Sequence, residues 1–580
     1  MPRFHRIVAA GLSAMLVVSC ARSGVDQPPT AAIDTADKVA PAAPSVADNI
    51  VVTGSSRRAA PGEWADRSAQ GFAAPPPPPY PAKMLAQPWT PPYHDEGRDR
   101  FTATSQNPFK LVRDEPVSTF SIDVDTASYA FVRASLNRST LPQPAAVRTE
   151  EMVNYFPYDY AAPTSAAQPF STNVAVFPSP WNAGRKLVRI GIRGYDIQRS
   201  TRPRANLVFL IDTSGSMNEP NKLPLVKQSL DMLLDSLDGD DSVAIVTYAG
   251  YAGTALAPTP ASQKARIRAV IDSLGAGGGT AGAEGIRQAY ALAEQNLDPH
   301  GVNRVILATD GDFNIGITNQ DELKGYIERE RGKGVFLSVL GFGMGNYNDA
   351  LMQALAQNGN GAAAYIDTLS EARKTLVDEA SSTLFPIAKD VKIQVEFNPA
   401  TVSEYRLIGY ETRMLAREDF NNDKVDAGDV GSGQTVTALY EVTPVGGPRS
   451  VDGLRYAPGP MVAARCAQCG TGGELGFVKI RYKLPKSDTS RLISTPIDLR
   501  SAYATFAAAP QDARFAAGVA AFAELLRGGK YNGSMTWDDV LRIATNARGE
   551  DSFGYRAEFI QMVRAAKSAG AMASLGGGVD

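Results

Sequence analysis

The middle of the chain alternates short apolar runs with longer segments in which apolar residues recur at helical spacing. Residues 207–211, 242–248, 305–308 and 335–340 are runs of mostly apolar residues, as strands buried on both faces require. Between these runs, an apolar residue at every third or fourth position predicts amphipathic helices. The residues that carry this spacing are Leu223, Val226, Leu230, Leu233, Leu234 and Leu237, then Ile267, Val270, Ile271 and Leu274, then Ile286 and Tyr290, and finally Leu323 and Ile327. The alternation over residues 205–384 predicts an α/β fold with a doubly wound, mostly parallel sheet.

Other patterns flank this α/β domain. Residues 186–193 alternate apolar and charged side chains, which is typical of a half-buried strand, and belong to a small N-terminal α+β region predicted over residues 100–200. Strict alternation returns later in the chain and predicts an antiparallel, β-rich region over residues 388–500. Residues 501–570 return to helical spacing and predict a helical C-terminal region.

The first twenty residues predict a secretory signal. A basic start precedes an apolar run at residues 7–18, which is too short to span a bilayer. The end of this segment, up to Cys20, resembles the cleavage box of bacterial lipoproteins, in which the cysteine is lipidated. Ala21, rather than Asp, follows the cysteine, and by resemblance to Gram-negative lipoproteins this favours the outer membrane over the inner membrane. We therefore expect a lipid-anchored envelope protein, in preference to an unlipidated signal peptide with an incidental cysteine.

Residues 21–99 are rich in Ala, Pro, Ser and Asp and end in proline runs. Such a segment buries too little apolar surface to offset its ordering entropy, so we expect a disordered tether that polyproline partly stiffens. Ile50–Thr53 interrupts the tether with a β-branched patch that resembles a short segment near the start of many TonB-dependent receptors. A strand that adds to a partner sheet is one interpretation, but a chance patch in a linker is favoured.

The charge balance and the few histidines argue against several classes of function. The 580 residues include 58 Lys and Arg against 61 Asp and Glu, a net charge of −3, so nothing favours nucleic-acid binding as the main role. The three histidines are His5, His94 and His300, and the first two fall in the signal and the tether. This placement argues against a histidine zinc site or a Ser-His-Asp hydrolase.

Polar clusters follow the strands and helices of the α/β domain at the places where such sheets bind ligands. Asp212, Ser214 and Ser216 come directly after the first buried strand. Thr280 follows the second helix and a run of three glycines, and Asp310 follows the strand at residues 305–308. Ligands of open α/β sheets bind beyond the carboxyl ends of the strands, so these side chains are candidates for one site.

The order D-x-S-x-S, then Thr, then Asp resembles the metal-ion-dependent adhesion site of the von Willebrand factor type A (VWA) domain. All five positions match, at Asp212, Ser214, Ser216, Thr280 and Asp310. The resemblance implies that the hydroxyls contact the metal directly, that the carboxylates act mostly through water, and that a Glu or Asp of a protein partner fills an open position. Oxygen ligands without His or Cys suit a hard cation, here Mg²⁺ or another divalent ion such as Mn²⁺ or Ca²⁺.

Each polar cluster alone has an ordinary explanation, because Asp and Ser cap helices and Asp-Gly forms turns. The three clusters together favour the metal site. A separate pair, Asp123 and Asp125, resembles the start of a haloacid-dehalogenase phosphatase motif, with the first Asp as nucleophile and the second as acid/base. Ala127 stands where that motif has Thr or Val, so a turn at the end of a strand is favoured.

Cys466 and Cys469 lie in a glycine-rich connection of the β-rich region. An oxidising compartment favours a local disulfide between them, and half of a zinc site is the alternative.

The order of signal, tether, N-terminal region, VWA domain and C-terminal region resembles a family of bacterial VWA lipoproteins. We expect a non-catalytic, Mg²⁺-dependent module for protein binding or adhesion, anchored to the membrane by lipid. The alternatives are an assembly factor for another envelope complex, since some VWA proteins are partners of AAA+ ATPases, and a phosphatase that uses Asp123 and Asp125.

Overall fold

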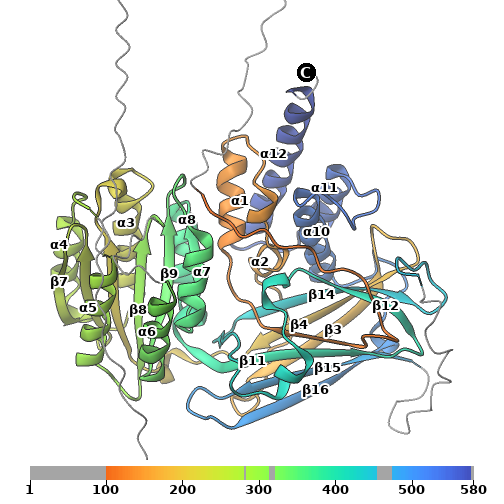
Figure 1. Ribbon diagram of the computed structural model, residues 1–580, viewed down its shortest axis with the longest axis horizontal. Helices are drawn as coiled ribbons and strands as arrows, with labels where there is room; N and C mark the ends of the chain where they lie inside the picture. Colours follow the sequence, from red (N-terminus) through yellow and green to blue (C-terminus); the bar gives the residue numbers. More distant parts are fainter. Residues whose placement is uncertain (1–98, 280–281, 312–319, 453–472, 577–580) are drawn as a thin grey trace, which may run out of the picture. The chain divides into compact units, whose positions relative to one another are not determined.

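The computed structural model describes residues 99–576, apart from residues 280–281, 312–319 and 453–472. The strands of this part of the chain form one six-stranded sheet and two five-stranded sheets (Figure 1). None of the helices within these residues combines the length and the apolar character that crossing a bilayer requires.

The six-stranded sheet confirms the predicted fold class. Its order is β10-β9-β8-β5-β6-β7, and neighbouring strands are parallel except for the pair β6 and β7. Every residue of β5 and β8 is buried, as their continuous apolar runs predict. The strands are β5 (Ala205–Asp212), β6 (Ser242–Tyr248), β7 (Ala252–Pro260), β8 (Val302–Thr309), β9 (Val335–Phe342) and β10 (Ala363–Ile366).

Helices cover both faces of this sheet. The apolar sides of α3, α4 and α8 pack on one face, and those of α5, α6 and α7 pack on the other. The bounds are α3 (Leu223–Ser236), α4 (Lys264–Ser273), α5 (Gly282–Gln295), α6 (Gln320–Gly332), α7 (Asp349–Asn358) and α8 (Leu369–Arg373). A π-helical turn at Lys374–Asp378 and α9 (Ala380–Leu384) then lead out of the domain.

The two five-stranded sheets are mostly antiparallel and enclose a second apolar core. One sheet has the order β1-β12-β14-β4-β3, and the other has β13-β11-β15-β16 with β2 also paired to β11. The strands are β1 (Lys110–Leu111), β2 (Val117–Ser121), β3 (Phe170–Pro178), β4 (Lys186–Gly194), β11 (Pro386–Phe397), β12 (Val402–Ile408), β13 (Val430–Gly431), β14 (Thr435–Pro444), β15 (Glu474–Lys483) and β16 (Ser490–Asp498).

These sheets join strands from both sides of the VWA domain, which the sequence patterns did not predict. Phe120 of β2 pairs with Ile393 of β11, and Ile190 of β4 pairs with Ala438 of β14. The regions expected at residues 100–200 and 388–500 therefore share their sheets and one core. The VWA domain is an insertion between strands of this β structure.

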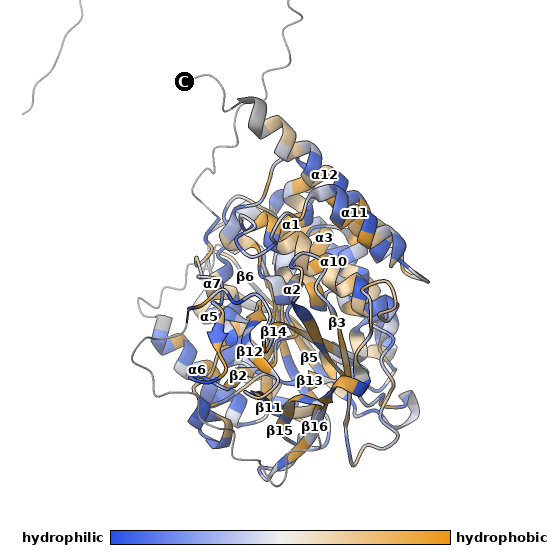
Figure 2. Ribbon diagram, turned by 90° about the vertical axis from the view of Figure 1, so that its right-hand side faces the viewer, coloured by the Kyte–Doolittle hydropathy of each residue, from blue (hydrophilic) through white to orange (hydrophobic). Residues whose placement is uncertain are grey.

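A group of helices packs on the β structure. α10 consists largely of small apolar residues and is almost wholly buried, whereas α11 and α12 alternate apolar and polar residues (Figure 2). α1 and α2, which precede the VWA domain, share the apolar core of these C-terminal helices. The bounds are α1 (Ala127–Asn137), α2 (Thr149–Asn154), α10 (Gln511–Leu526), α11 (Trp537–Asn546) and α12 (Tyr555–Gly576).

Candidate metal centre

Asp212, the last residue of β5, is fully buried at the carboxyl edge of the sheet. Its Oδ1 accepts a hydrogen bond from the backbone N–H of Ser214 at 2.9 Å. Its Oδ2 accepts hydrogen bonds from the hydroxyls of Tyr248 and Thr309, both at 3.1 Å. Burial, the largest effect, raises the pKa of Asp212, although hydrogen bonds from Ser214 oppose the shift. The three adjacent strands thus fix this carboxylate beneath the loop that follows β5.

The two serines of this loop bring their hydroxyls together. Ser214 Oγ and Ser216 Oγ are 3.1 Å apart, with Ser214 buried and Ser216 exposed. Adjacent ligand oxygens around Mg²⁺, with bonds of about 2.1 Å in octahedral geometry, are about 3 Å apart. The hydroxyl spacing therefore fits two neighbouring ligands of one Mg²⁺-sized cation.

Asp310 follows the end of β8 and is fully buried. Its Oδ2 accepts a hydrogen bond from the ammonium of Lys222 at 3.1 Å. Burial by itself raises the pKa of Asp310, but hydrogen bonds from Asn346 and Ser216 and the charge of Lys222 outweigh it, so this pKa lies below its usual value. The hydrogen bond from Ser216 places Asp310 beside the loop that follows β5.

The glycine run approaches the same loop. The N–H of Gly277 donates to the carbonyl of Thr213 at 2.8 Å, and the N–H of Gly215 donates to the carbonyl of Gly278 at 3.2 Å. Gly278 has φ +84°, and a Cβ there would lie 3.3 Å from the backbone nitrogen of Gly250. The approach therefore depends on glycine. Thr280 itself lies outside the described residues, as do Cys20, Cys466 and Cys469.

The structure thus brings four of the five predicted ligands, Asp212, Ser214, Ser216 and Asp310, to one edge of the sheet. The sequence interpretation missed three residues that hold them, which are Lys222, Tyr248 and Thr309. Thr309 and Tyr248 end the strands on either side of β5. Thr309 and Tyr248 could have been predicted as part of the site, because both lie at the carboxyl ends of predicted strands. Lys222 precedes a helix, and nothing in the sequence marks it as part of the site.

Asp123 and Asp125 form a different kind of site. One guanidinium nitrogen of Arg413 donates to Asp123 Oδ1 at 3.0 Å and to Asp125 Oδ2 at 2.7 Å. The N–H of Ala363, at the start of β10, donates to Asp125 Oδ1 at 2.8 Å. A third carboxylate, Glu151, has an oxygen within 4.8 Å of both aspartates. Burial and then the charge of Asp123 raise the pKa of Asp125 to about 8, although Arg413 opposes the shift.

This arrangement joins three parts of the chain. The two aspartates belong to the segment after β2, Ala363 to the VWA domain, and Arg413 to the segment after β12. Both aspartates are at least 96% buried. Asp123 is 2% exposed and its Oδ1 is held by Arg413, which is a poor placement for a nucleophile that must attack a phosphate, so the geometry gives the phosphatase alternative no support.

Three stretches of the chain match known families. Residues 206–379 match the von Willebrand factor type A domain, residues 95–189 match a family described as von Willebrand factor, and residues 382–569 match the C-terminal region of the uncharacterized protein YfbK. YfbK of Escherichia coli (strain K12) is 46% identical over 476 residues, which cover 81% of this chain and 81% of that protein. The chain belongs to the YfbK family of VWA proteins.

More distant relatives share the VWA part. Human inter-alpha-trypsin inhibitor heavy chain H4 is 29% identical over 231 residues, which cover 37% of this YfbK-family chain and 24% of that protein. Among solved structures, a von Willebrand factor type A protein from Catenulispora acidiphila is 14% identical, with 69% of this chain and 91% of that chain covered and a TM-score of 0.38.

Proposed function

We propose that this YfbK-family protein is a lipid-anchored protein of the cell envelope whose VWA domain binds a protein partner through a divalent cation. We favour Mg²⁺ as the cation, with Mn²⁺ or Ca²⁺ as alternatives. It is held by Asp212, Ser214, Ser216, Thr280 and Asp310, and a Glu or Asp of the partner completes its coordination. The role of the site is binding, without catalysis.

The observation that carries the proposal is the 3.1 Å separation of the Ser214 and Ser216 hydroxyls above the buried carboxylate of Asp212. Hydroxyls are neutral ligands, so a cation that they hold keeps much of its positive charge. Asp212 Oδ2 is already occupied by the hydroxyls of Tyr248 and Thr309. This arrangement favours contact between Asp212 and the cation through a bound water. The cation then keeps positive charge that an acidic side chain of the partner can neutralise.

The rim of the site offers an anchor for such a partner. Tyr251, in the hairpin between β6 and β7, is 77% exposed. The same hairpin packs against the glycine run through Gly250, whose backbone nitrogen lies near Gly278. Exposed aromatic residues often supply much of the binding energy in protein interfaces. We therefore expect Tyr251 to contact the partner beside its acidic residue.

The proposal is tested with the metal alone before any partner is known. We expect Mg²⁺ to raise the melting temperature of the wild-type protein, because a ligand that binds the native state stabilises it by RT ln(1 + [L]/Kd). Ser216→Ala removes an exposed hydroxyl and is expected to lose most of this shift. The melting temperature in EDTA is expected to fall only slightly, through loss of the hydrogen bonds to Ser214 and Asp310. Ser273→Ala, an exposed serine at the end of α4, is the matched control. A Mg²⁺ shift of equal size in wild type and Ser216→Ala would refute the metal site.

Binding of the partner is tested separately. The purified wild-type protein is immobilised with Mg²⁺ or with EDTA, incubated with envelope extract, and compared with Thr280→Ala. The expected result is a partner retained only by wild type with Mg²⁺. A partner retained equally by Thr280→Ala, and still dependent on Mg²⁺, would contradict the proposed ligand set.

A further inference from the structure

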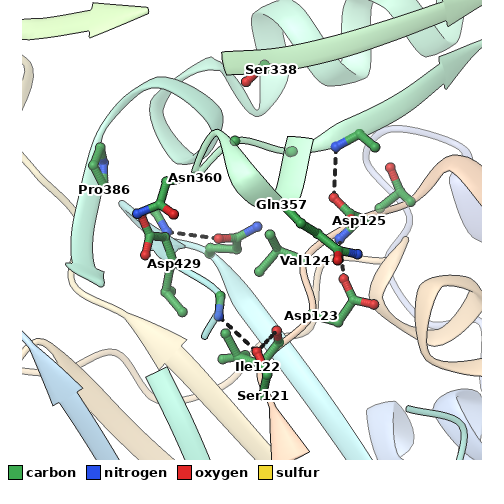
Figure 3. Close-up of a pocket in the computed structure, with 18 of the residues that line it drawn as sticks. Ser121, Ile122, Asp123, Val124, Asp125, Ser338, Gln357, Asn360, Pro386 and Asp429 are labelled. Atoms are coloured by element: carbon green, nitrogen blue, oxygen red, sulfur yellow. Dashed lines mark hydrogen bonds between the residues drawn. The ribbon is translucent and has the colours of Figure 1, made fainter. Parts of the chain in front are cut away.

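A cavity of about 250 Å³ lies away from the metal centre, between the VWA sheet and the β structure. Figure 3 shows its walls, with Ser338 of β9 on one side and Asp429, just before β13, on another. Arg304, the third residue of β8, also lines it. Asp310 follows the other end of β8, six residues on, so Arg304 and Asp310 are about 20 Å apart along the strand. The cavity is therefore a second, independent feature of the VWA domain.

Arg304 brings a buried positive charge to this cavity. The residue is 3% exposed, and its guanidinium NH1 donates to the neutral hydroxyl of Ser338 at 2.6 Å. Its Nε has no hydrogen-bond partner, and within the described part of the chain no carboxylate lies at ion-pair distance from the guanidinium. Burial lowers the pKa of Arg304 to about 10, which is consistent with a charge that no close anion neutralises. The guanidinium carbon lies 5.7 Å from the centre of the Phe336 ring, but the group has no ionic partner. A buried charge without an ionic partner is costly, and an anionic group in the cavity would lower that cost.

Asp429 brings a carboxyl group to the same cavity. It is half-buried, and its Oδ1 accepts a long hydrogen bond of 3.3 Å from the N–H of Asp390. Burial, and then the charge of Asp426, raise the pKa of Asp429 to about 7. Asp429 and Arg304 attract one another electrostatically, but they do not form an ion pair. Other charged residues line the same cavity, but Arg413 pairs with Asp123 and Asp125, Arg331 with Asp426, and Lys374 with Glu379. Among the described residues of its wall, Arg304 and Asp429 are thus opposite charges that no ion pair joins, because β8 and the segment before β13 hold them apart.

We propose that this cavity binds a small zwitterion, whose anionic group contacts Arg304 and Ser338 and whose ammonium group contacts Asp429. The volume is just below the range of about 300–1,000 Å³ that is typical of drug-sized ligands, so it suits a compact molecule. A single ligand with both charges would satisfy the guanidinium and the carboxyl together, which a simple anion or a simple amine would not do. The site does not involve the metal centre and does not depend on the function proposed for it.

The test compares three probes of equal chain length by saturation-transfer difference NMR. These probes are γ-aminobutyrate with both charged ends, butyrate with the anionic end and butylammonium with the cationic end. The measurements are made above pH 7, where the Asp429 carboxyl is ionised. The expected result is a clear signal for γ-aminobutyrate and a weaker or absent signal for the other two.

Two variants locate the binding. Arg304→Gln and Asp429→Asn are each expected to abolish the γ-aminobutyrate signal, and Arg204→Gln, at an exposed arginine, is expected to keep it. Asp429→Asn replaces a half-buried carboxyl by an amide of the same size, so it tests the site even where Arg304→Gln impairs folding. The proposal is overturned by no signal from γ-aminobutyrate, by equal signals from all three probes, or by a signal that persists in Asp429→Asn. Binding that depends on Mg²⁺ would also overturn it, because it would assign the probe to the metal centre.

Discussion

The ammonium of Lys222 lies 3.1 Å from Oδ2 of Asp310, within the candidate metal centre. Lys222 is 3% exposed, and its side chain passes over Gly343, where a Cβ would lie 2.4 Å from the Cε of the lysine. Asp212 and Asp310 together carry two negative charges, and Lys222 adds one positive charge. A divalent cation bound there leaves a net charge of about +1, which attracts an acidic ligand.

Lys222→Met is expected to strengthen metal binding. The substitution removes the positive charge of Lys222, which repels the bound cation. A gain of about 1.4 kcal/mol in binding free energy corresponds to about tenfold in affinity. Isothermal titration with Mg²⁺ measures this change, and Lys264→Met, a partly exposed lysine beside Asp235, is the control. An unchanged or weaker affinity in Lys222→Met would show that the lysine supports the site in another way.

The pKa values around Asp125 predict how stability depends on pH. Burial first, and then neighbouring carboxylates, raise the pKa of Asp125 and of Glu150 to about 8 in the folded protein, from ordinary values near 4. The folded state then holds protons that the unfolded state has released. This contribution is complete below about pH 4 and is lost as the pH rises toward 8, at up to roughly 1.4 kcal/mol per pH unit for each group.

We therefore expect the melting temperature to fall between pH 6 and pH 8, and Asp125→Asn to reduce the slope, since an amide does not ionise. The quantity to compare is the slope, because loss of the Arg413 contact also changes the absolute stability. Asp114→Asn, at a more exposed aspartate, provides the baseline. A slope that Asp125→Asn leaves unchanged would mean that Asp125 is ionised in the folded protein.

The candidate metal centre was predictable because four of its five proposed ligands follow strands that apolar runs mark in the sequence. Once β5 and β8 are recognised, Asp212, Ser214, Ser216 and Asp310 fall at their carboxyl ends, which meet at one edge of a parallel sheet. Lys222 was not predictable in this way. Its contact with Asp310 spans 88 residues and depends on the turn before α3 and on space at Gly343, neither of which a local pattern encodes.

The pairing of strands in the β structure was likewise not predictable from local sequence patterns. Alternation predicted a strand at residues 186–193 and a β-rich region over residues 388–500, but alternation shows which face of a strand is buried and not which strand it pairs with. Phe120 and Ile393 face one another in register across an intervening domain. The contacts of Arg413 with Asp123 and Asp125 were missed for the same reason, since they span 290 and 288 residues.

Arg133→Met is expected to destabilise the protein strongly. The buried Arg133 guanidinium forms ion pairs with Asp367, with Glu371 at 2.7 Å and with Glu558 at 2.8 Å, and so joins α1 to the VWA domain and to α12. Breaking one side of a buried ion pair costs about 3–5 kcal/mol, because the remaining charges stay buried. Urea unfolding measures the loss, with Arg138→Met, at an exposed arginine near the same helix, as the control. Equal stability of the two variants would contradict this role.

Tyr251→Ala is expected to weaken partner binding without changing metal binding. The side chain is 77% exposed, so its removal leaves no cavity, and the metal ligands lie in other loops. An aromatic residue that anchors an interface contributes about 2 kcal/mol or more to the binding free energy, which corresponds to at least tenfold in affinity. The check is surface plasmon resonance with the captured partner, beside a Mg²⁺ titration of the same variant. Unaltered partner affinity would place the interface on another side of the metal centre.

Cys20→Ala tests the anchor on which the envelope location depends. If lipid on Cys20 attaches the protein, this variant loses the acyl chains that hold it at the membrane and accumulates as a soluble periplasmic protein or an uncleaved precursor. Cell fractionation with immunodetection separates these outcomes from the membrane-bound wild type, and metabolic labelling with a fatty acid should mark only the wild type. Ser19→Ala changes the neighbouring residue and keeps the cysteine, so it is expected to remain anchored. A Cys20→Ala protein that stays in the membrane fraction at its mature size would remove the basis for a lipid anchor.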